Sequence, residues 1–224
     1  MAAVRRRLWM ACIEAVALTV STALVVRLAL RLAGAVDTAR DWAALAAAAV
    51  VGYLAADLAS GLVHWFCDKF FEEDTPIVGR MIIAPFREHH RDPLALTRHG
   101  FLDLNGNNAL VAAPVLLWAS RQEALSAFGV ASLVFFSLAV LATNQLHAWA
   151  HAPRAPRPVR WLQQGRLILT PGRHARHHRD GHVGTYCVTA GWLNPLLDRV
   201  RFFESCEAVL ASLGLPRAAG EGSR

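Results

Sequence analysis

The chain has 224 residues, of which 54% are hydrophobic and 18% are charged, and its formal net charge is +6. This composition is too apolar for an ordinary soluble domain and too charged for a bundle of spanning helices alone, and it excludes intrinsic disorder. The four cysteines lie far apart and form no CxxC pair. Their spacing argues against a disulfide scaffold, an iron–sulfur cluster and a cysteine–zinc site.

Four apolar stretches follow one another along the chain. They cover residues 9–30, 42–63, 108–120 and 124–146. A spanning helix needs about 20 apolar residues, so the first, second and fourth stretches are long enough to cross a membrane. The third stretch is shorter, and it either crosses fully or enters as a shallow hairpin. The sequence therefore predicts an all-α integral membrane bundle of about four transmembrane helices.

The first stretch follows three arginines, as the apolar part of a signal peptide does. It is long for a signal peptide and no small-residue cleavage site follows it, so we expect a retained helix. The histidine-rich segments 64–107 and 147–200 join the spans, and we expect one membrane domain over residues 1–224.

Basic residues predict the orientation of this bundle. They concentrate in the amino-terminal tail, in segment 64–107 and in the segment from residue 147 onward. Four spans place all three regions on one side, which the positive-inside rule makes cytoplasmic. We expect a multi-pass protein of the inner membrane, if the source is bacterial, with its histidine-rich helical cap in the cytoplasm. Nucleic-acid binding would need a soluble basic face with interleaved aromatic residues, and the sequence offers none. We therefore expect no nucleic-acid partner.

Asp57 lies inside the second stretch, where a carboxylate is costly unless it has a partner. Asp57, His64 and Asp68 are seven and eleven residues apart and so share one helix face. Asp57 is therefore a candidate hydrogen-bond acceptor beneath a site at the end of this helix. The alternative is a helix–helix hydrogen bond without a catalytic role.

All ten histidines fall between His64 and His182, and their spacing repeats. The groups are His64 with Asp68 four residues later, the doublet His89–His90, then His99, the pair His147 and His151, the cluster His174, His177 and His178, and finally His182. Residues four apart on a helix lie side by side, so these groups predict metal ligands at the cytoplasmic ends of the apolar helices. Packing alone requires no such repeated spacing.

The number of imidazoles indicates the metal. A zinc site takes three or four ligands, and no HExxH motif is present. Haem needs only two axial histidines. Eight or more imidazoles with few carboxylates suit two iron ions that keep positions open for dioxygen. The Glu-x-x-His pairs of the soluble carboxylate di-iron bundles are absent from the sequence.

Six strings in order carry a family resemblance: DLASGLVHWFCD, PFREHHRDPLALTRHGF, NGNN, TNQLHAWAH, HARHHRDGH and YCVTAGWLN. Together they resemble the Kua and CarF-type lipid desaturases, the plasmanylethanolamine desaturase family, over residues 57–194. The resemblance implies an oxygen-dependent membrane oxidoreductase that converts the 1-O-alkyl chain of an ethanolamine ether phospholipid into the vinyl ether of a plasmalogen. Its two histidine boxes correspond here to His147/His151 and to His174/His177/His178.

The resemblance and the spacing of the residues together suggest roles at the site. Further family histidines match His64, His89, His90, His99 and His182, of which His99 and His182 are the less certain ligands. The first box reads His64-x-x-x-Asp68, so a carboxylate lies near the metals as a ligand or as an acceptor that orients one. Asp57 would orient an imidazole in the same way. Asn144, three residues before His147, would hold a metal-bound water or make a helix-packing hydrogen bond.

Electrons for such a reaction must come from outside the chain. No GxGxxG, P-loop or CxxCH motif is present. The resemblance thus implies a carrier such as cytochrome b5 or a ferredoxin. Arginines between Arg154 and Arg179 are candidates to dock that carrier or phospholipid headgroups, unless they serve topology alone.

Three other functions stay open at this point. The first is an acyl-lipid desaturase or hydroxylase with the same di-iron site, because histidine geometry does not distinguish the substrates. The second is a zinc-dependent membrane lipid hydrolase. The third is a metal transporter or sensor, although ionisable groups here gather at one boundary instead of lining several spans.

Overall fold

The computed structural model describes residues 2–76, 78–179 and 181–215, and all regular elements in that part of the chain are helices. The chain divides into two compact units. The first unit comprises Met1–Ala56 and His99–Gln145, and the second comprises Asp57–Arg98 and Leu146–Arg224. The expected all-α fold is confirmed.

Three helices of the described chain are long and apolar enough to cross a membrane. They are α1 (Ala2–Ala33), α2 (Ala39–Lys69) and α5 (Ala127–His151). The expected fourth span, residues 108–120, forms the second half of α4 (Phe101–Arg121). Because the first turns of α4 contain the polar sequence DLNGNN, its mean hydropathy is lowered; it is not among the candidate spans, and a count of four is not confirmed.

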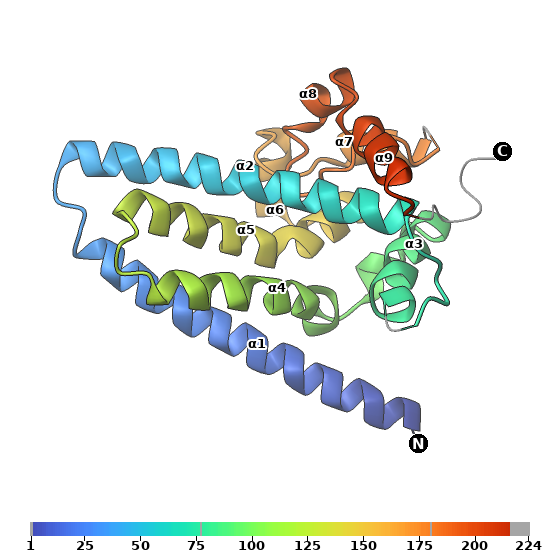
Figure 1. Ribbon diagram of the computed structural model, residues 1–224, viewed down its shortest axis with the longest axis horizontal. Helices are drawn as coiled ribbons and strands as arrows, with labels where there is room; N and C mark the ends of the chain where they lie inside the picture. The colour runs from blue at the N-terminus through green and yellow to red at the C-terminus, as the bar shows by residue number, and fades with distance from the viewer. Residues whose placement is uncertain (1, 77, 180, 216–224) are drawn as a thin grey trace. The chain divides into compact units, whose positions relative to one another are not determined.

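In the first unit, α1 and α4 lie side by side (Figure 1). Leu28, Leu116, Val130 and Val134 belong to its buried apolar core, to which α1, α4 and α5 all contribute. A Cβ atom added to Gly52 would lie 2.4 Å from the carbonyl oxygen of Ser132, so glycine permits the close approach of α2 and α5 here. These contacts bury one side of each helix and leave large apolar residues on the surface, as a lipid-facing helix requires.

The second unit contains the short helices. They are the π-helix η1 (Gly79–Ile83), α3 (Ala84–Arg91), the 3-10 helix η2 (Ala95–Arg98), α6 (Arg157–Gln164), α7 (Pro171–Arg179), α8 (Asn194–Arg199) and α9 (Phe202–Ser212). Helices α3, α6 and α8 carry proline in their first turn, where the missing N–H breaks no helical hydrogen bond.

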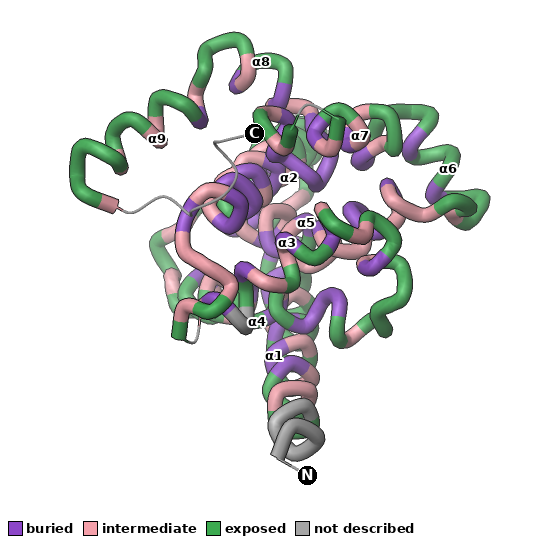
Figure 2. Tube along the Cα trace, turned by 90° about the vertical axis from the view of Figure 1, so that its right-hand side faces the viewer, coloured by how far each residue is buried: buried purple, intermediate pink, exposed green. Residues whose placement is uncertain are grey.

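An aromatic core holds the second unit together. Trp65 and Phe70 pack in it with Tyr186 and Phe203, and all four side chains are buried. The ring centroids of Tyr186 and Phe203 are 4.8 Å apart, and those of Trp65 and Phe70 are 5.3 Å apart. Most of the residues of α9 beyond this core are exposed or only partly buried (Figure 2). The core fixes the end of α2 against the loop that contains Tyr186.

Candidate metal centre

Two long helices each present a pair of side chains four residues apart in the second unit. His64 and Asp68 lie in the last turns of α2, and His147 and His151 end α5. Side chains at this spacing meet on one helix face. His64, Asp68 and His147 are buried, and His151 is partly buried.

Two short helices complete the set. Helix α3 carries the doublet His89 and His90, and α7 carries His174, His177 and His178. Adjacent residues on a helix point about 100° apart, so a doublet sends its two rings to different neighbours. The structure brings seven of the expected histidines and Asp68 into two groups of four.

The first group is made of imidazoles only. It consists of His89, His147, His151 and His174, with one nitrogen from each ring within 4.8 Å of the others. The Nε2 atom of His174 lies 2.8 Å from that of His147 and 2.8 Å from that of His151. The Nε2 atom of His178 lies 3.0 Å from that of His174, so this ring borders the same group.

The second group contains a carboxylate. It consists of His64, Asp68, His90 and His177, again within 4.8 Å of one another. The Nε2 atom of His90 lies 3.2 Å from that of His177 and 3.5 Å from that of His64. The Oδ2 atom of Asp68 lies 3.4 Å from Nε2 of His177 and 3.6 Å from Nε2 of His64.

The crowding of nitrogens around His174 fits a bound cation. A ring nitrogen carries either one hydrogen or one in-plane lone pair, so hydrogen bonding does not satisfy three neighbours around it at once. Nitrogens that bind one metal ion at about 2.1 Å are themselves about 3 Å apart, as these are. The buried Nε2 atom of His89 has no hydrogen-bond partner among the described residues, which also fits a metal ligand.

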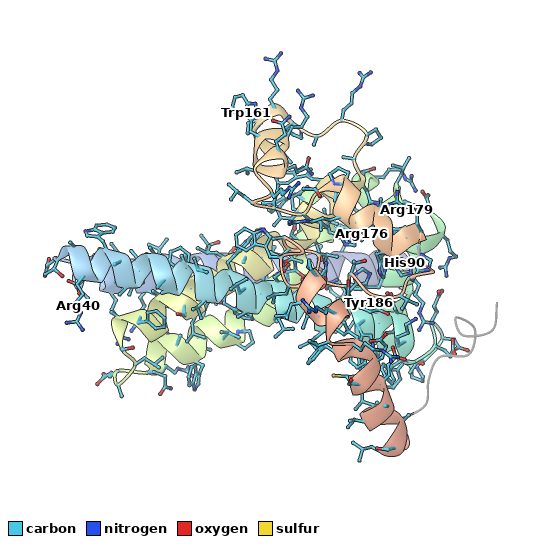
Figure 3. The ribbon with its side chains drawn as sticks, turned by 90° about the horizontal axis from the view of Figure 1, so that it is seen from above. Arg40, His90, Trp161, Arg176, Arg179 and Tyr186 are labelled. Carbon is cyan, nitrogen blue, oxygen red and sulfur yellow. The ribbon has the colours of Figure 1, made fainter. Side chains whose placement is uncertain are left out.

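Backbone carbonyls orient two rings of the second group. Nδ1–H of His64 donates to the carbonyl oxygen of Tyr186 at 3.1 Å, and Nδ1–H of His177 donates to that of Gly184 at 2.9 Å. Each bond fixes the tautomer and turns the Nε2 lone pair toward the group. Figure 3 shows the labelled His90 and Tyr186 near each other beside α7.

The structure gives Asp57 a different partner from the expected imidazole. Its carboxylate accepts hydrogen bonds from the backbone N–H groups of Ala190, Gly191 and Leu193, at 2.8, 2.9 and 3.2 Å. Gly191 has a φ of 67°, which glycine adopts without strain. Asp57 therefore anchors residues 190–193 of the loop whose carbonyls at 184 and 186 orient the rings of the second group.

Arg87 ties the two ligand-bearing helices α2 and α3 together. Its guanidinium donates to the carbonyl oxygens of Cys67, Asp68 and Phe71 at 3.1, 3.2 and 2.8 Å. Cys67 and Asp68 lie in the last turn of α2 and Phe71 follows its end, where carbonyls lack helical partners, so the fork of Arg87 caps α2 from α3. The sequence does not predict this role of Arg87, because the partners of its side chain are backbone atoms.

Burial favours the neutral form of three imidazoles on α3 and α7. Desolvation, reinforced by neighbouring histidines, lowers the pKa of His89 and of His174 well below the ordinary histidine value. The same causes lower the pKa of His178 to about 3. A metal ligand must be the neutral imidazole, so the environment prepares these rings for binding near neutral pH.

The remaining expected site residues lie outside the two groups. His182 stacks on His90 with ring centroids 3.9 Å apart, and it has a positive φ of 59°. His99 is exposed, belongs to the first unit and pairs with Asp103. Asn144 also belongs to the first unit and donates to the carbonyl oxygen of Leu104 at 2.8 Å. This contact is a helix-packing hydrogen bond, which is the second of the two roles expected for Asn144.

Residues 53–218 match the family described as the lipid desaturase domain. The chain belongs to the lipid desaturase family. It is 40% identical over 172 residues to plasmanylethanolamine desaturase of Myxococcus xanthus, covering 74% of this chain and 60% of that protein. It is 40% identical over 173 residues to plasmanylethanolamine desaturase 1 of Mus musculus, covering 73% of this chain and 64% of that protein.

A third relative carries a different name. The chain is 35% identical over 173 residues to chloroplastic fatty acid desaturase 4 of Arabidopsis thaliana, covering 73% of this chain and 51% of that protein. The chain thus spans between half and two thirds of the length of these three relatives. No solved structure matches the chain. All eight residues of the two ligand groups lie inside the matched lipid desaturase domain.

Proposed function

We propose that this protein is a membrane oxidoreductase that introduces a double bond into the 1-O-alkyl chain of an ethanolamine ether phospholipid, forming a vinyl ether. The pairing of two four-ligand groups at the ends of apolar helices is the observation that carries this proposal. The names of two relatives, both plasmanylethanolamine desaturases at 40% identity, favour the ether-lipid substrate.

The reaction sets the chemical demand on the site. Two hydrogens leave neighbouring carbons beside the ether oxygen, and dioxygen takes them up with two electrons and two protons to give two water molecules. These C–H bonds are not acidic, so no side-chain base removes the hydrogens. Two iron ions held by the two groups would supply oxidation by dioxygen, which suits nitrogen-rich sites with open positions.

The chain's own residues would hold and orient this centre. His89, His147, His151 and His174 would bind one ion, and His64, His90, His177 and Asp68 the other. The carbonyls of Tyr186 and Gly184 fix two of these rings, and the burial of both groups excludes water. We place this centre at the cytoplasmic face of the membrane, with cytochrome b5 or a ferredoxin as the electron donor.

Lipid analysis of a host that makes alkyl ether lipids but no plasmalogens tests the substrate. Expression of the full chain should produce acid-labile vinyl ether phospholipids in aerobic cells and none without oxygen. Elemental analysis of the purified protein should find about two irons per chain, as two four-ligand groups require. One zinc per chain and almost no iron would contradict the proposal and favour a lipid hydrolase.

A second candidate is desaturation of an acyl chain. Its support is the 35% identity to chloroplastic fatty acid desaturase 4 over 73% of this chain. The same two groups serve either substrate, since both reactions oxidise unactivated C–H bonds. New double bonds in ester-linked chains, with alkyl ether lipids unchanged, would select this candidate over the first.

A further inference from the structure

Helix α6 is amphipathic, with one face buried and the rest of its surface exposed. Val159 and Gln163 are its buried residues, at 6% and 8% exposure. The opposite side presents the indole of Trp161, which is 69% exposed, and Leu162, which is 40% exposed, lies about 100° from it around the helix axis. In Figure 3, Trp161 lies on the outer side of α6, away from His90 and Tyr186.

Arginines flank this apolar edge. Arg157 and Arg160 are exposed on α6, and Arg154 is exposed just before it. None of the three pairs with a carboxylate in the part of the chain that the structure describes. The sequence contains seven arginines and no aspartate or glutamate over residues 147–179, so the positive charge here is uncompensated locally.

The chain holds α6 close to the end of a membrane span. Helix α5, a candidate span, ends at His151, and α6 begins at Arg157. The six Cα–Cα steps from His151 to Arg157 span at most about 22 Å when fully extended, at about 3.6 Å per residue. A short helix that exposes tryptophan and leucine next to arginines, at this position, matches the headgroup boundary of a bilayer.

Gln163 connects this surface to the metal centre. Its side-chain amide donates to the carbonyl oxygens of Trp149 and Leu169, both at 3.3 Å. Trp149 lies between His147 and His151 on α5, and Leu169 immediately precedes the segment that leads into α7. The position of α6 is thus coupled to α5 and to the segment that leads into α7, two of the three helices that supply the first ligand group.

We propose that α6 is an interfacial anchor that binds anionic phospholipid headgroups through Arg154, Arg157 and Arg160 and places Trp161 and Leu162 among the upper acyl carbons. The anchor sets the depth of the metal centre through the hydrogen bonds of Gln163. An acidic protein could bind the same arginines. The exposed side chains of Trp161 and Leu162, however, favour the apolar layer of a bilayer as the partner of this surface. This inference does not depend on the reaction proposed above.

Tryptophan fluorescence of the full metal-loaded chain in lipid nanodiscs tests the anchor. The contribution of Trp161 is the difference between the unaltered protein and Trp161→Phe. Phosphatidylcholine brominated at the upper acyl carbons should quench this contribution strongly, and aqueous iodide should quench it weakly. Adding phosphatidylglycerol should strengthen quenching by the brominated lipid, because anionic headgroups attract the arginines.

Arg157→Gln/Arg160→Gln should lose this response to phosphatidylglycerol, whereas Arg199→Gln, which removes an exposed arginine from α8, should keep it. Strong iodide quenching of Trp161 without quenching by brominated lipid would overturn the proposal. Protection of Trp161 from iodide by an added acidic carrier protein, but not by phosphatidylglycerol, would also overturn it and identify a protein docking surface.

Discussion

At the scale of single residues, the candidate centre is built from imidazole nitrogens that are buried or partly buried and lie close to one another. His147 contributes Nε2 at 2.8 Å from His174 and 3.3 Å from His151, so it is central to the first group. His99, an exposed histidine paired with Asp103, is outside both groups and provides a matched control.

His147→Ala should reduce the metal content from about two ions to about one per chain, because three remaining ligands hold the first ion weakly. Desaturation should fall to background. His99→Ala should keep both metal content and product. Elemental analysis and lipid chromatography measure the two effects, and equal losses in both variants would contradict the assignment of ligands.

The lowered pKa values predict how the metal responds to acid. An ordinary histidine is half protonated at about pH 6.5, and protons displace a metal ion below that pH. Because burial lowers the pKa of His89 and His174, and that of His178 to about 3, protonation of these rings requires a lower pH. Metal content after dialysis should therefore be unchanged at about pH 6 and fall only at more acidic pH. Release with a midpoint near pH 6.5 would contradict the lowered values.

Arg87 is a positioning residue, and α3 offers its own control. Arg87→Lys removes the planar fork that contacts several carbonyls at the end of α2 and leaves a single nitrogen. Activity should fall about 10–100-fold, as for other residues that orient metal ligands. Arg91→Lys, an exposed position on α3 paired with Glu73, should leave activity nearly unchanged.

A merely structural role for Arg87 would lower the yield of folded protein but leave the bound metal unchanged. The electronic absorption of the iron-loaded protein distinguishes these cases. Arg87→Lys should shift the iron absorption in protein that is still folded, and an unchanged spectrum with unchanged activity would remove the positioning role.

At the scale of elements, hydropathy predicted the helices better than it predicted their ends. Apolar stretch 42–63 became α2, which extends to Lys69, and stretch 124–146 became α5, which extends to His151. The polar ligands interrupt the apolar composition, but the backbone hydrogen bonds continue through them. The spacing of the histidines therefore marked helical turns that composition alone does not reveal.

The loop over residues 184–194 was not predictable from the sequence. Its contacts with α2 join backbone atoms to side chains, as when the backbone N–H of Val188 donates to the hydroxyl of Ser60 at 3.0 Å. Backbone carbonyls occur in every residue and leave no signature in sequence. The role expected of Asp57 thus differed from its observed contacts, although its placement on the ligand face of α2 was derived from spacing.

Gly61 permits this loop to lie directly on α2. An added Cβ atom would lie 2.6 Å from Sγ and 3.2 Å from the backbone nitrogen of Cys187, so the loop must shift. Gly61→Ala should lower the free energy of unfolding by about 1–3 kcal/mol, as overpacking does. A shift in thermal midpoint in detergent, measured by circular dichroism, checks this expectation.

Gly172→Ala on α7 is the control, because nothing lies within 4 Å of its added Cβ atom. Alanine in a helix is favoured over glycine by about 0.5–1 kcal/mol, so this variant should be neutral or slightly more stable. A Gly61→Ala protein as stable as the Gly172→Ala protein would show that the loop does not depend on close contact.

At the scale of the whole molecule, all eight ligands of the two groups belong to the second unit. Helices α3 and α7 are only 8 and 9 residues long, and helices of this length are marginal without tertiary support. Metal ions shared among α2, α3, α5 and α7 would provide that support. The metal should therefore stabilise the second unit far more than the first.

Removal of the metal with a chelator should increase amide hydrogen exchange in α3 and α7. Exchange in α1 and α4, which pack in the first unit without contributing ligands, should change little. Mass spectrometry of peptides from the full chain measures both. Equal increases in both units would instead indicate general unfolding and would contradict this division of stability.

The two ligand groups differ in one respect that has a chemical consequence. Three imidazoles and the carboxylate of Asp68 form one group, whereas the other has four imidazoles. A hard anionic oxygen stabilises a ferric ion more than a neutral nitrogen does. A pair of irons held by these groups would thus be inequivalent, and stepwise reduction should yield a mixed-valence form in which the ion beside Asp68 is the last to accept an electron.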